Sequence, residues 1–207
     1  MRLFLASEAK NPLSINRLKE FVGGDFTKHK ITYIPTAANG SYYGHWKGGE
    51  SIRVVKSLGA QVNIVELEDY SFIDVRNELK RSTIVWMAGG MSGYLLYWIR
   101  RLELDKILPE LLNSGLLYVG SSVGSMICSK TQDLADWYIG EPEPGASVIP
   151  GLGLIDFEIF PHYTEDLYSE INKHWEKGKL CLLKNGDVVT KVGEKIKILG
   201  EEKYLIK

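Results

Sequence analysis

The chain has 207 residues, of which 44% are hydrophobic and 25% charged, a composition typical of a soluble globular domain. Its formal net charge of −1, without a Lys/Arg block, argues against a nucleic-acid-binding protein. No apolar run reaches the roughly 18 residues that span a membrane, and the N-terminus does not resemble a signal peptide. We therefore expect one cytoplasmic domain over residues 1–207, with Cys128 and Cys181 as buried, reduced thiols.

Apolar, β-branched runs alternate with helix-like segments over the first 121 residues. The pattern predicts, in chain order, a strand at 2–7, a helix at 14–24, a strand at 30–37, a helix at 49–60, a strand at 61–67, a helix at 72–81, a strand at 83–90, one or two helices at 94–115 interrupted near Pro109, and a strand at 116–121. Such alternation predicts βαβ units. We therefore expect an α/β fold with three layers and a doubly wound, mostly parallel sheet.

The last thirty residues have a different pattern. Short alternating runs are separated by Asn185-Gly186, Gly193-Glu194 and Gly200-Glu201, which are hairpin signals. They predict a small C-terminal antiparallel meander. The segment 141–153 is rich in Pro and Gly, and we expect it to be a surface loop within the single domain.

The segment 116–128, LLYVGSSVGSMIC, contains Gly120-Ser121-Ser122-Val123-Gly124 between a predicted buried strand and a helix-like run. Gly and Ser are common in ordinary turns. G-x-S-x-G between a strand and a helix is also the pattern of a nucleophile elbow, which holds a serine on a strained turn. This context makes Ser122 the candidate nucleophile.

A serine nucleophile needs a base, and His162 is the best candidate among four histidines. It follows the strand-like run 154–160 and precedes a helix start, so it lies at the end of a strand. His29 and His174 have surface-like surroundings. His45 lies on a strand-end loop, where a structural role or a ligand contact would fit.

The sequence offers two possible locations for the acid that orients the base. Asp133 and Asp136 lie between the serine and the histidine, which is the chain order of elbow-type hydrolases, and we prefer Asp136. Glu165 follows His162, where it could also be a favourable charge in a helix's first turn. The oxyanion hole would use the N–H of Val123 together with Gly89 or Gly90.

Four segments resemble the aspartyl dipeptidase (dipeptidase E) family, which includes cyanophycinase. They are YIPTAA at 33–38, AGGMSGYLL at 88–96, GSSVGS at 120–125 and PHYT at 161–164, in the order and near the spacing of that family. The resemblance implies a serine peptidase on a fold similar to class I glutamine amidotransferases. It carries the nucleophile to Ser122, the base to His162, the oxyanion glycine to Gly90 and, with one residue deleted, the acid to Asp136.

The chain departs from that family at two places. Met91 stands where the family has an asparagine that would contact substrate, and no arginine lies between His162 and Lys173 to bind an acidic substrate side chain. We therefore expect neutral or apolar N-terminal residues to be accepted at least as well as aspartate.

The leading function is hydrolysis of small peptides, with no metal and no cofactor. One alternative is a catalytically silent module that binds a peptide or small molecule in the same pocket. A small esterase is another, although the HGGG-type oxyanion motif is absent. A glutamine amidotransferase is set aside because it would carry cysteine at position 122.

Overall fold

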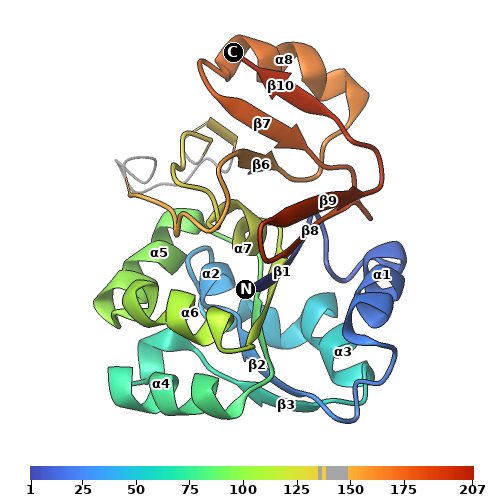
Figure 1. Ribbon diagram of the computed structural model, residues 1–207. Helices are drawn as coiled ribbons and strands as arrows, with labels where there is room; N and C mark the ends of the chain where they lie inside the picture. Colours follow the sequence, from blue (N-terminus) through green and yellow to red (C-terminus); the bar gives the residue numbers. More distant parts are fainter. Residues whose placement is uncertain (135–136, 139–148) are drawn as a thin grey trace.

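The computed structural model describes residues 1–134, 137–138 and 149–207, and within them the chain forms a mixed α/β fold with two sheets (Figure 1). The large sheet has the strand order β3-β2-β4-β5-β1-β8-β9, and the small sheet has the order β10-β7-β6. The strands are β1 (Arg2–Ala6), β2 (Lys30–Ile34), β3 (Gln61–Ile64), β4 (Ile84–Met87), β5 (Leu117–Ser121), β6 (Glu158–Phe160), β7 (Lys179–Leu182), β8 (Val188–Val192), β9 (Lys195–Leu199) and β10 (Tyr204–Ile206).

Strands β1 to β5 are parallel; β1, β2, β4 and β5 are largely buried, whereas the edge strand β3 is only partly buried. Alternate residues point into two separate cores: Leu3 and Leu5 join one, and Phe4 and Ala6 join the other. Helices cover each face, which gives the three predicted layers. The second core is covered by α1 (Pro12–Val22) and α3 (Glu50–Ser57), and the first by α2 (Thr36–Asn39), α4 (Phe72–Arg81), α5 (Ser92–Arg101), α6 (Leu104–Asn113) and α7 (Val123–Met126).

The small sheet stands at the carboxyl edge of the large one, with α8 (Tyr168–His174) packed on it (Figure 1). Ile171 of α8, the adjacent Trp175 and Cys181 of β7 are buried in the same core as Leu3 and Leu5 of β1. The two sheets therefore share one hydrophobic core. None of the described helices is both long and apolar enough to cross a membrane.

The helix boundary expected near Pro109 is wrong. Pro109 lies inside α6, and the chain breaks earlier, where Glu103 takes a left-handed φ of 52° between α5 and α6. The apolar face of α6, with Leu104, Leu108 and Leu112 buried, packs on the core and keeps the helix continuous through the proline.

The C-terminal meander prediction needs a correction. The turns are where the sequence places them, but the strands are divided between two sheets. Hairpin β8–β9 extends the large sheet, because β8 pairs with β1 in the antiparallel direction. In contrast, β7 pairs parallel with β6 and antiparallel with β10. Because Ala6 is paired with Val188, the turn before β8 is brought to the carboxyl edge of β1.

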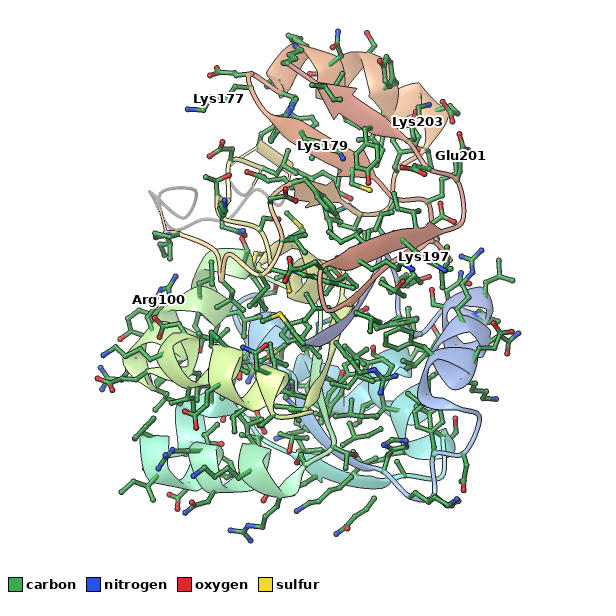
Figure 2. All side chains as sticks on the ribbon, viewed as in Figure 1. Arg100, Lys177, Lys179, Lys197, Glu201 and Lys203 are labelled. Atoms are coloured by element: carbon green, nitrogen blue, oxygen red, sulfur yellow. The ribbon has the colours of Figure 1, made fainter. Side chains whose placement is uncertain are left out.

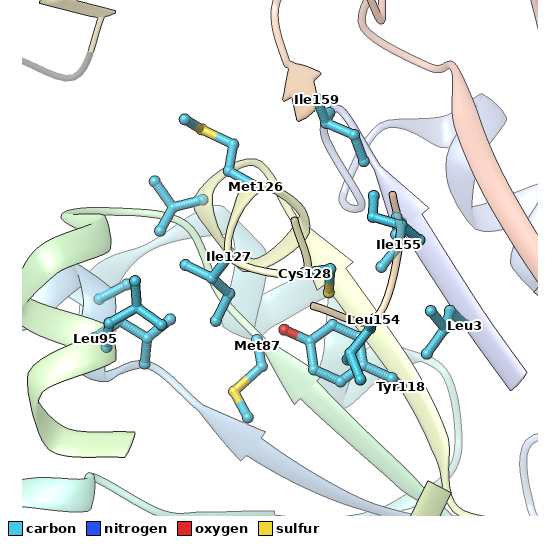
Figure 3. Packing of buried hydrophobic residues seen from close by; sticks show 14 of the residues in the cluster. Leu3, Met87, Leu95, Tyr118, Met126, Ile127, Cys128, Leu154, Ile155 and Ile159 are labelled. Carbon is cyan, nitrogen blue, oxygen red and sulfur yellow. The ribbon is translucent and has the colours of Figure 1, made fainter. Parts of the chain in front are cut away.

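The core beneath that edge holds the short helix α7 in place. Met126 is the last residue of α7, and Ile127 and Cys128 follow it; all three lie in the same buried core as Met87 and Tyr118 of the neighbouring strands (Figure 3). The Tyr118 hydroxyl donates a hydrogen bond of 2.7 Å to the Gly124 carbonyl. The turn that precedes α7 thus rests on a fully packed base.

Candidate active site

Ser122 lies on a strained turn between β5 and α7. Its φ of 53° and ψ of −116° are unusual for a residue other than glycine, and such strain concentrates at functional sites. The Ala6 carbonyl accepts from Ser122 N (3.1 Å) and from Ser125 Oγ (2.8 Å), which ties the turn to β1. A Cβ on Gly120 would lie 2.6 Å from the Gly124 carbonyl oxygen, so the turn needs glycine there. This is the geometry of a nucleophile elbow.

His162 faces Ser122 from the small sheet. It follows β6, and its own φ is 56°. Its Nε2 atom is 3.0 Å from Ser122 Oγ, and its Nδ1 atom is 2.7 Å from Asn185 Oδ1. Both side chains that touch the ring nitrogens therefore come from other elements.

Asn185 lies in a turn that follows β7, and the sheet register explains why it meets His162. Strands β6 and β7 are parallel with Phe160 opposite Leu182, so the residues after each strand leave the sheet at the same edge. The turn is fixed from behind, because the Gly186 carbonyl accepts hydrogen bonds from the Ser14 hydroxyl (3.2 Å) and from the Arg17 guanidinium. The exposed Asn185 amide is thus carried by an anchored turn.

The fully buried hydroxyl of Ser7 connects these two residues. It accepts a hydrogen bond from the backbone N–H of His162 (2.8 Å) and donates to Asn185 Oδ1 (3.3 Å). The hydroxyl can do both at once, because it accepts through a lone pair and still has its own proton to donate. The amide oxygen then faces His162 Nδ1, which donates, and Nε2 is left to accept from Ser122.

The acids considered from sequence lie elsewhere or outside the described structure. Asp136 lies outside the described residues. Asp133 lines a different cavity, of about 320 Å³, together with Glu158 and Lys177.

Glu165 joins the His162 segment to the segment that carries Asn185. Its carboxylate contacts Lys203 (2.6 Å) and Lys184 (3.1 Å) and accepts from the Tyr163 hydroxyl (2.7 Å). These contacts, with the Lys203 hydrogen bond foremost, lower the pKa of Glu165 to about 2. Figure 2 labels Lys203, which directly precedes β10.

The predicted oxyanion residues lie beside the serine. A Cβ on Gly89 would lie 3.1 Å from Ser122 Cβ, so this backbone closely approaches the nucleophile. Gly90 has a φ of 146°, and a Cβ there would overlap the Ala37 carbonyl. Val123 begins α7 directly after Ser122. Met91 precedes α5, and its N–H donates to the Ala37 carbonyl (2.8 Å).

A cavity of about 330 Å³ opens over these groups, near the lower end of the range for ligand pockets. Ser122, His162, Gly89 and Gly90 line it on one side. The rest of its described lining includes an apolar set, Tyr33, Ala38, Trp46 and Ala88, and a polar set, Glu8, Lys10, His45 and Ser51. Met91 is not part of that described lining.

The loop after β2 carries Trp46 and His45 into the cavity wall, and Asn39 holds this loop. The Asn39 amide oxygen accepts from Gly44 N (2.8 Å), and its amide nitrogen donates to Glu66 and Glu68 (2.9 Å each). Trp46 Nε1 also donates to Glu66 (3.1 Å). Sequence reasoning left the role of His45 open and did not find Glu8, Lys10 or Asn185.

The remaining candidate groups lie apart from the cavity. His29 Nδ1 lies 3.0 Å from Thr83 Oγ1, and His174 pairs with Glu170 at 2.8 Å, both as surface contacts. Burial raises the pKa values of Cys128 and Cys181 to about 12 each, so neither thiol is an activated nucleophile. Among the described residues, no group of three His, Cys, Asp or Glu side chains could hold a metal ion.

A serine on a strand-to-helix elbow, in contact with an imidazole whose other nitrogen is fixed by an acceptor, is the arrangement of a serine hydrolase. Peptidase family S51 matches residues 3–199, and the chain therefore belongs to this family and is a serine-type peptidase.

Named relatives agree with this assignment. The chain is 26% identical to an uncharacterized peptidase of Listeria monocytogenes, over 83% of this chain and 82% of the other. It is 28% identical to a peptidase E of Nostoc, over 83% of this chain and 67% of that protein.

Solved structures share the fold. A crystal structure titled as a peptidase E protein of Listeria monocytogenes superposes with a TM-score of 0.79 at 23% identity, over 96% of this chain and 97% of that one. A peptidase of an acI-B1 actinobacterium superposes with a TM-score of 0.73 at 17% identity, over 99% and 93%.

Proposed function

We propose that this peptidase hydrolyses short peptides of about dipeptide size, with Ser122 as the nucleophile and a covalent acyl-enzyme intermediate. The observation that carries the proposal is the hydrogen-bonded series Ser122–His162–Asn185 at the wall of a cavity of about 330 Å³. A cavity of this size encloses one or two residues rather than an extended chain.

The proposed reaction begins when His162 Nε2 takes the proton of Ser122 as Oγ attacks the peptide carbonyl carbon. The carbonyl oxygen becomes negatively charged, and we assign its stabilisation to the N–H groups of Val123 and Gly90. The C–N bond then breaks, and His162 returns the proton to the leaving amine. A water molecule, deprotonated by His162, attacks the acyl-enzyme and releases the acid product and Ser122.

Within this mechanism we assign the orienting role to Asn185 in place of Asp136. The Asn185 amide oxygen accepts the Nδ1–H of His162, and this fixes the tautomer in which Nε2 can take a proton. An amide supplies orientation without charge, so it stabilises the imidazolium less than a carboxylate would. Cys-His-Asn peptidases show that an asparagine can fill this place.

The apolar walls support acceptance of neutral or apolar N-terminal residues. Tyr33, Trp46 and Ala88 face the cavity, and the one Lys or Arg in its described lining, Lys10, is already paired with Glu50 at 2.9 Å. Lys173, which sequence reasoning considered as a replacement for the missing arginine, pairs with Glu170 at 3.5 Å and does not line the described cavity.

Three broader expectations belong to the same proposal. A kinship with class I glutamine amidotransferases is supported by the parallel sheet with an elbow after β5. A single domain is supported by the core that both sheets share. A cytoplasmic location is supported by the two buried free thiols, Cys128 and Cys181.

The test is a screen of dipeptides with varied first residues, run on the natural protein and on Ser122→Ala, with labelling by a fluorophosphonate. The proposal predicts cleavage and labelling in the natural protein and neither in the variant. Binding of dipeptides without cleavage or labelling would instead indicate the silent binding module. Cleavage of simple esters with no cleavage of dipeptides would indicate the esterase.

A further inference from the structure

The cavity contains a carboxylate that the proposed reaction does not use. Glu8 follows β1, and the next residue is tied to the elbow, because Ala9 N donates to the Ser121 hydroxyl at 3.0 Å. Glu8 therefore lies on a segment fixed to the nucleophile's own turn, and it lines the same cavity as Ser122 and His162.

Glu8 has no close cationic partner among the described ion pairs. Lys10 lies 2.9 Å from Glu50 but 3.5 Å from Glu8, so its close partner is Glu50. Charge-assisted hydrogen bonds between an ammonium and a carboxylate usually measure about 2.7–2.9 Å, which leaves Glu8 only loosely engaged. Glu50 is compensated by Lys10 and by the nearby Arg53, so the Glu8 carboxylate has no close cation among the described ion pairs. A cationic group on the substrate would supply one.

A short peptide carries such a group close to its first carbonyl. In the N-terminal residue, the α-nitrogen lies about 2.5 Å from the carbonyl carbon, given standard bond lengths and angles. A peptide cleaved after its first residue therefore places its ammonium beside the nucleophile. Glu8 is partly buried, with 24% of its side chain exposed, whereas Glu50 is 61% exposed and does not line the described cavity.

We propose that Glu8 binds the α-ammonium group of the substrate and so restricts this enzyme to peptides with a free N-terminus. This inference rests on the proposed function and adds the residue that selects the substrate. Lys10 and Glu50 then act as a neighbouring ion pair that keeps Glu8 from being fully neutralised from within the protein.

The first test compares kcat/KM at pH 7 for leucine p-nitroanilide and its N-acetyl derivative, in the natural protein, Glu8→Gln and the control Glu50→Gln. Glu50→Gln removes the same charge from the same lysine, but outside the cavity. Glu8→Gln should lower kcat/KM for the free amine by about 10- to 150-fold, the range for a hydrogen bond to a charged group. It should leave the acetylated substrate nearly unchanged, and Glu50→Gln, which frees Lys10 to engage Glu8, should lower kcat/KM for the free amine by less than Glu8→Gln does. Glu8→Asp, which keeps the charge, should restore part of the loss.

The second measurement needs no catalysis. Calorimetry should show that leucinamide binds the natural protein at least about 10-fold more tightly than N-acetyl-leucinamide, and that Glu8→Gln removes the difference. Equal binding of the two ligands, or an equal loss in Glu8→Gln and Glu50→Gln, would overturn the role of Glu8. Absence of fluorophosphonate labelling in the natural protein would refute the proposed function instead, while the calorimetric comparison would still decide on Glu8.

Discussion

His162 Nδ1 and Asn185 Oδ1 lie 2.7 Å apart, although 23 residues separate them along the chain. Their meeting depends on the parallel pairing of β6 with β7, which sends both residues out of the same edge of the small sheet. The imidazole therefore faces Ser122 with its second nitrogen held by a neutral acceptor. We propose that the chemistry of the site depends on that acceptor.

Replacing Asn185 tests whether it orients the base. Asn185→Leu keeps a similar volume but removes the acceptor, so we expect kcat to fall by about 10²-fold or more, within the range of general acid–base effects. Asn185→Asp keeps the acceptor and adds a charge that favours a protonated imidazole, so kcat should be maintained or increased. Steady-state kinetics across pH measures both variants.

The same pH series tests the direction in which the pH dependence of kcat shifts. A carboxylate at position 185 stabilises the protonated form of His162, which cannot accept the serine proton. The acid limb of kcat should therefore move to higher pH in Asn185→Asp. Normal turnover in Asn185→Leu would contradict the orienting role and return it to another residue, with Asp136 the first to examine.

The buried hydroxyl of Ser7 should position the Asn185 amide. Ser7→Ala removes the acceptor of His162 N–H and the donor to Asn185 Oδ1, so we expect kcat to fall about 10-fold with KM little changed. Ser14→Ala is the matched control, because this equally buried serine donates to Gly186 of the same turn. If the two variants lose stability and kcat alike, Ser7 serves the fold and not the orientation of the amide.

The Glu165 cluster should contribute stability that depends on pH. Its pKa is about 2 in the folded protein against an ordinary value of 4.5, so the ionised form is favoured by folding. The contribution is complete above about pH 4.5 and is lost as pH falls toward 2. The Tm difference between the natural protein and Glu165→Gln should therefore be constant near neutrality and shrink across this window.

Thermal unfolding followed by circular dichroism measures that difference. Glu194→Gln, an exposed carboxylate in the β8–β9 turn, is the control and should show no such window. Because Glu165 is exposed, we expect a small effect. A Tm difference that stays the same from pH 7 to pH 2 would mean that the cluster contributes packing alone.

We expect the cavity walls to determine specificity for the first residue. With Tyr33, Trp46 and Ala88 in the lining and Lys10 paired, aspartate finds no free arginine-like partner. The kcat/KM for Leu-X dipeptides should equal or exceed that for matched Asp-X dipeptides. A preference for Asp above about 100-fold would show that an acid-binding group exists where neither the sequence nor the described cavity places one.

Much of this fold could be predicted from sequence because its signals are local. The apolar runs of β1 to β5 and the glycines around Ser122 each indicate their own structure, and a parallel sheet brings strand ends to one edge. His162 could be proposed for the same reason, since it directly follows a strand-like run.

The rest depends on pairings that are distant in sequence. Asn185-Gly186 looks like an ordinary hairpin turn, and only the pairing of β6 with β7 and of β8 with β1 places it beside His162. Glu8 is not part of a recognisable motif. Its position beside the elbow depends on the hydrogen bond from Ala9 N to the Ser121 hydroxyl. The break at Glu103 was missed because Pro109 is the stronger local signal, and burial of α6 overrides it.

The most direct test of the central claim is mass spectrometry of the protein after reaction with a fluorophosphonate at pH 7. Ser122 should carry one adduct, located by peptide mapping to residues 120–125. Ser122→Ala should carry none, whereas Ser121→Ala, whose hydroxyl accepts from Ala9, should still be labelled. Labelling that persists in Ser122→Ala, or that disappears only in Ser121→Ala, would contradict the assignment of the nucleophile and the mechanism built on it.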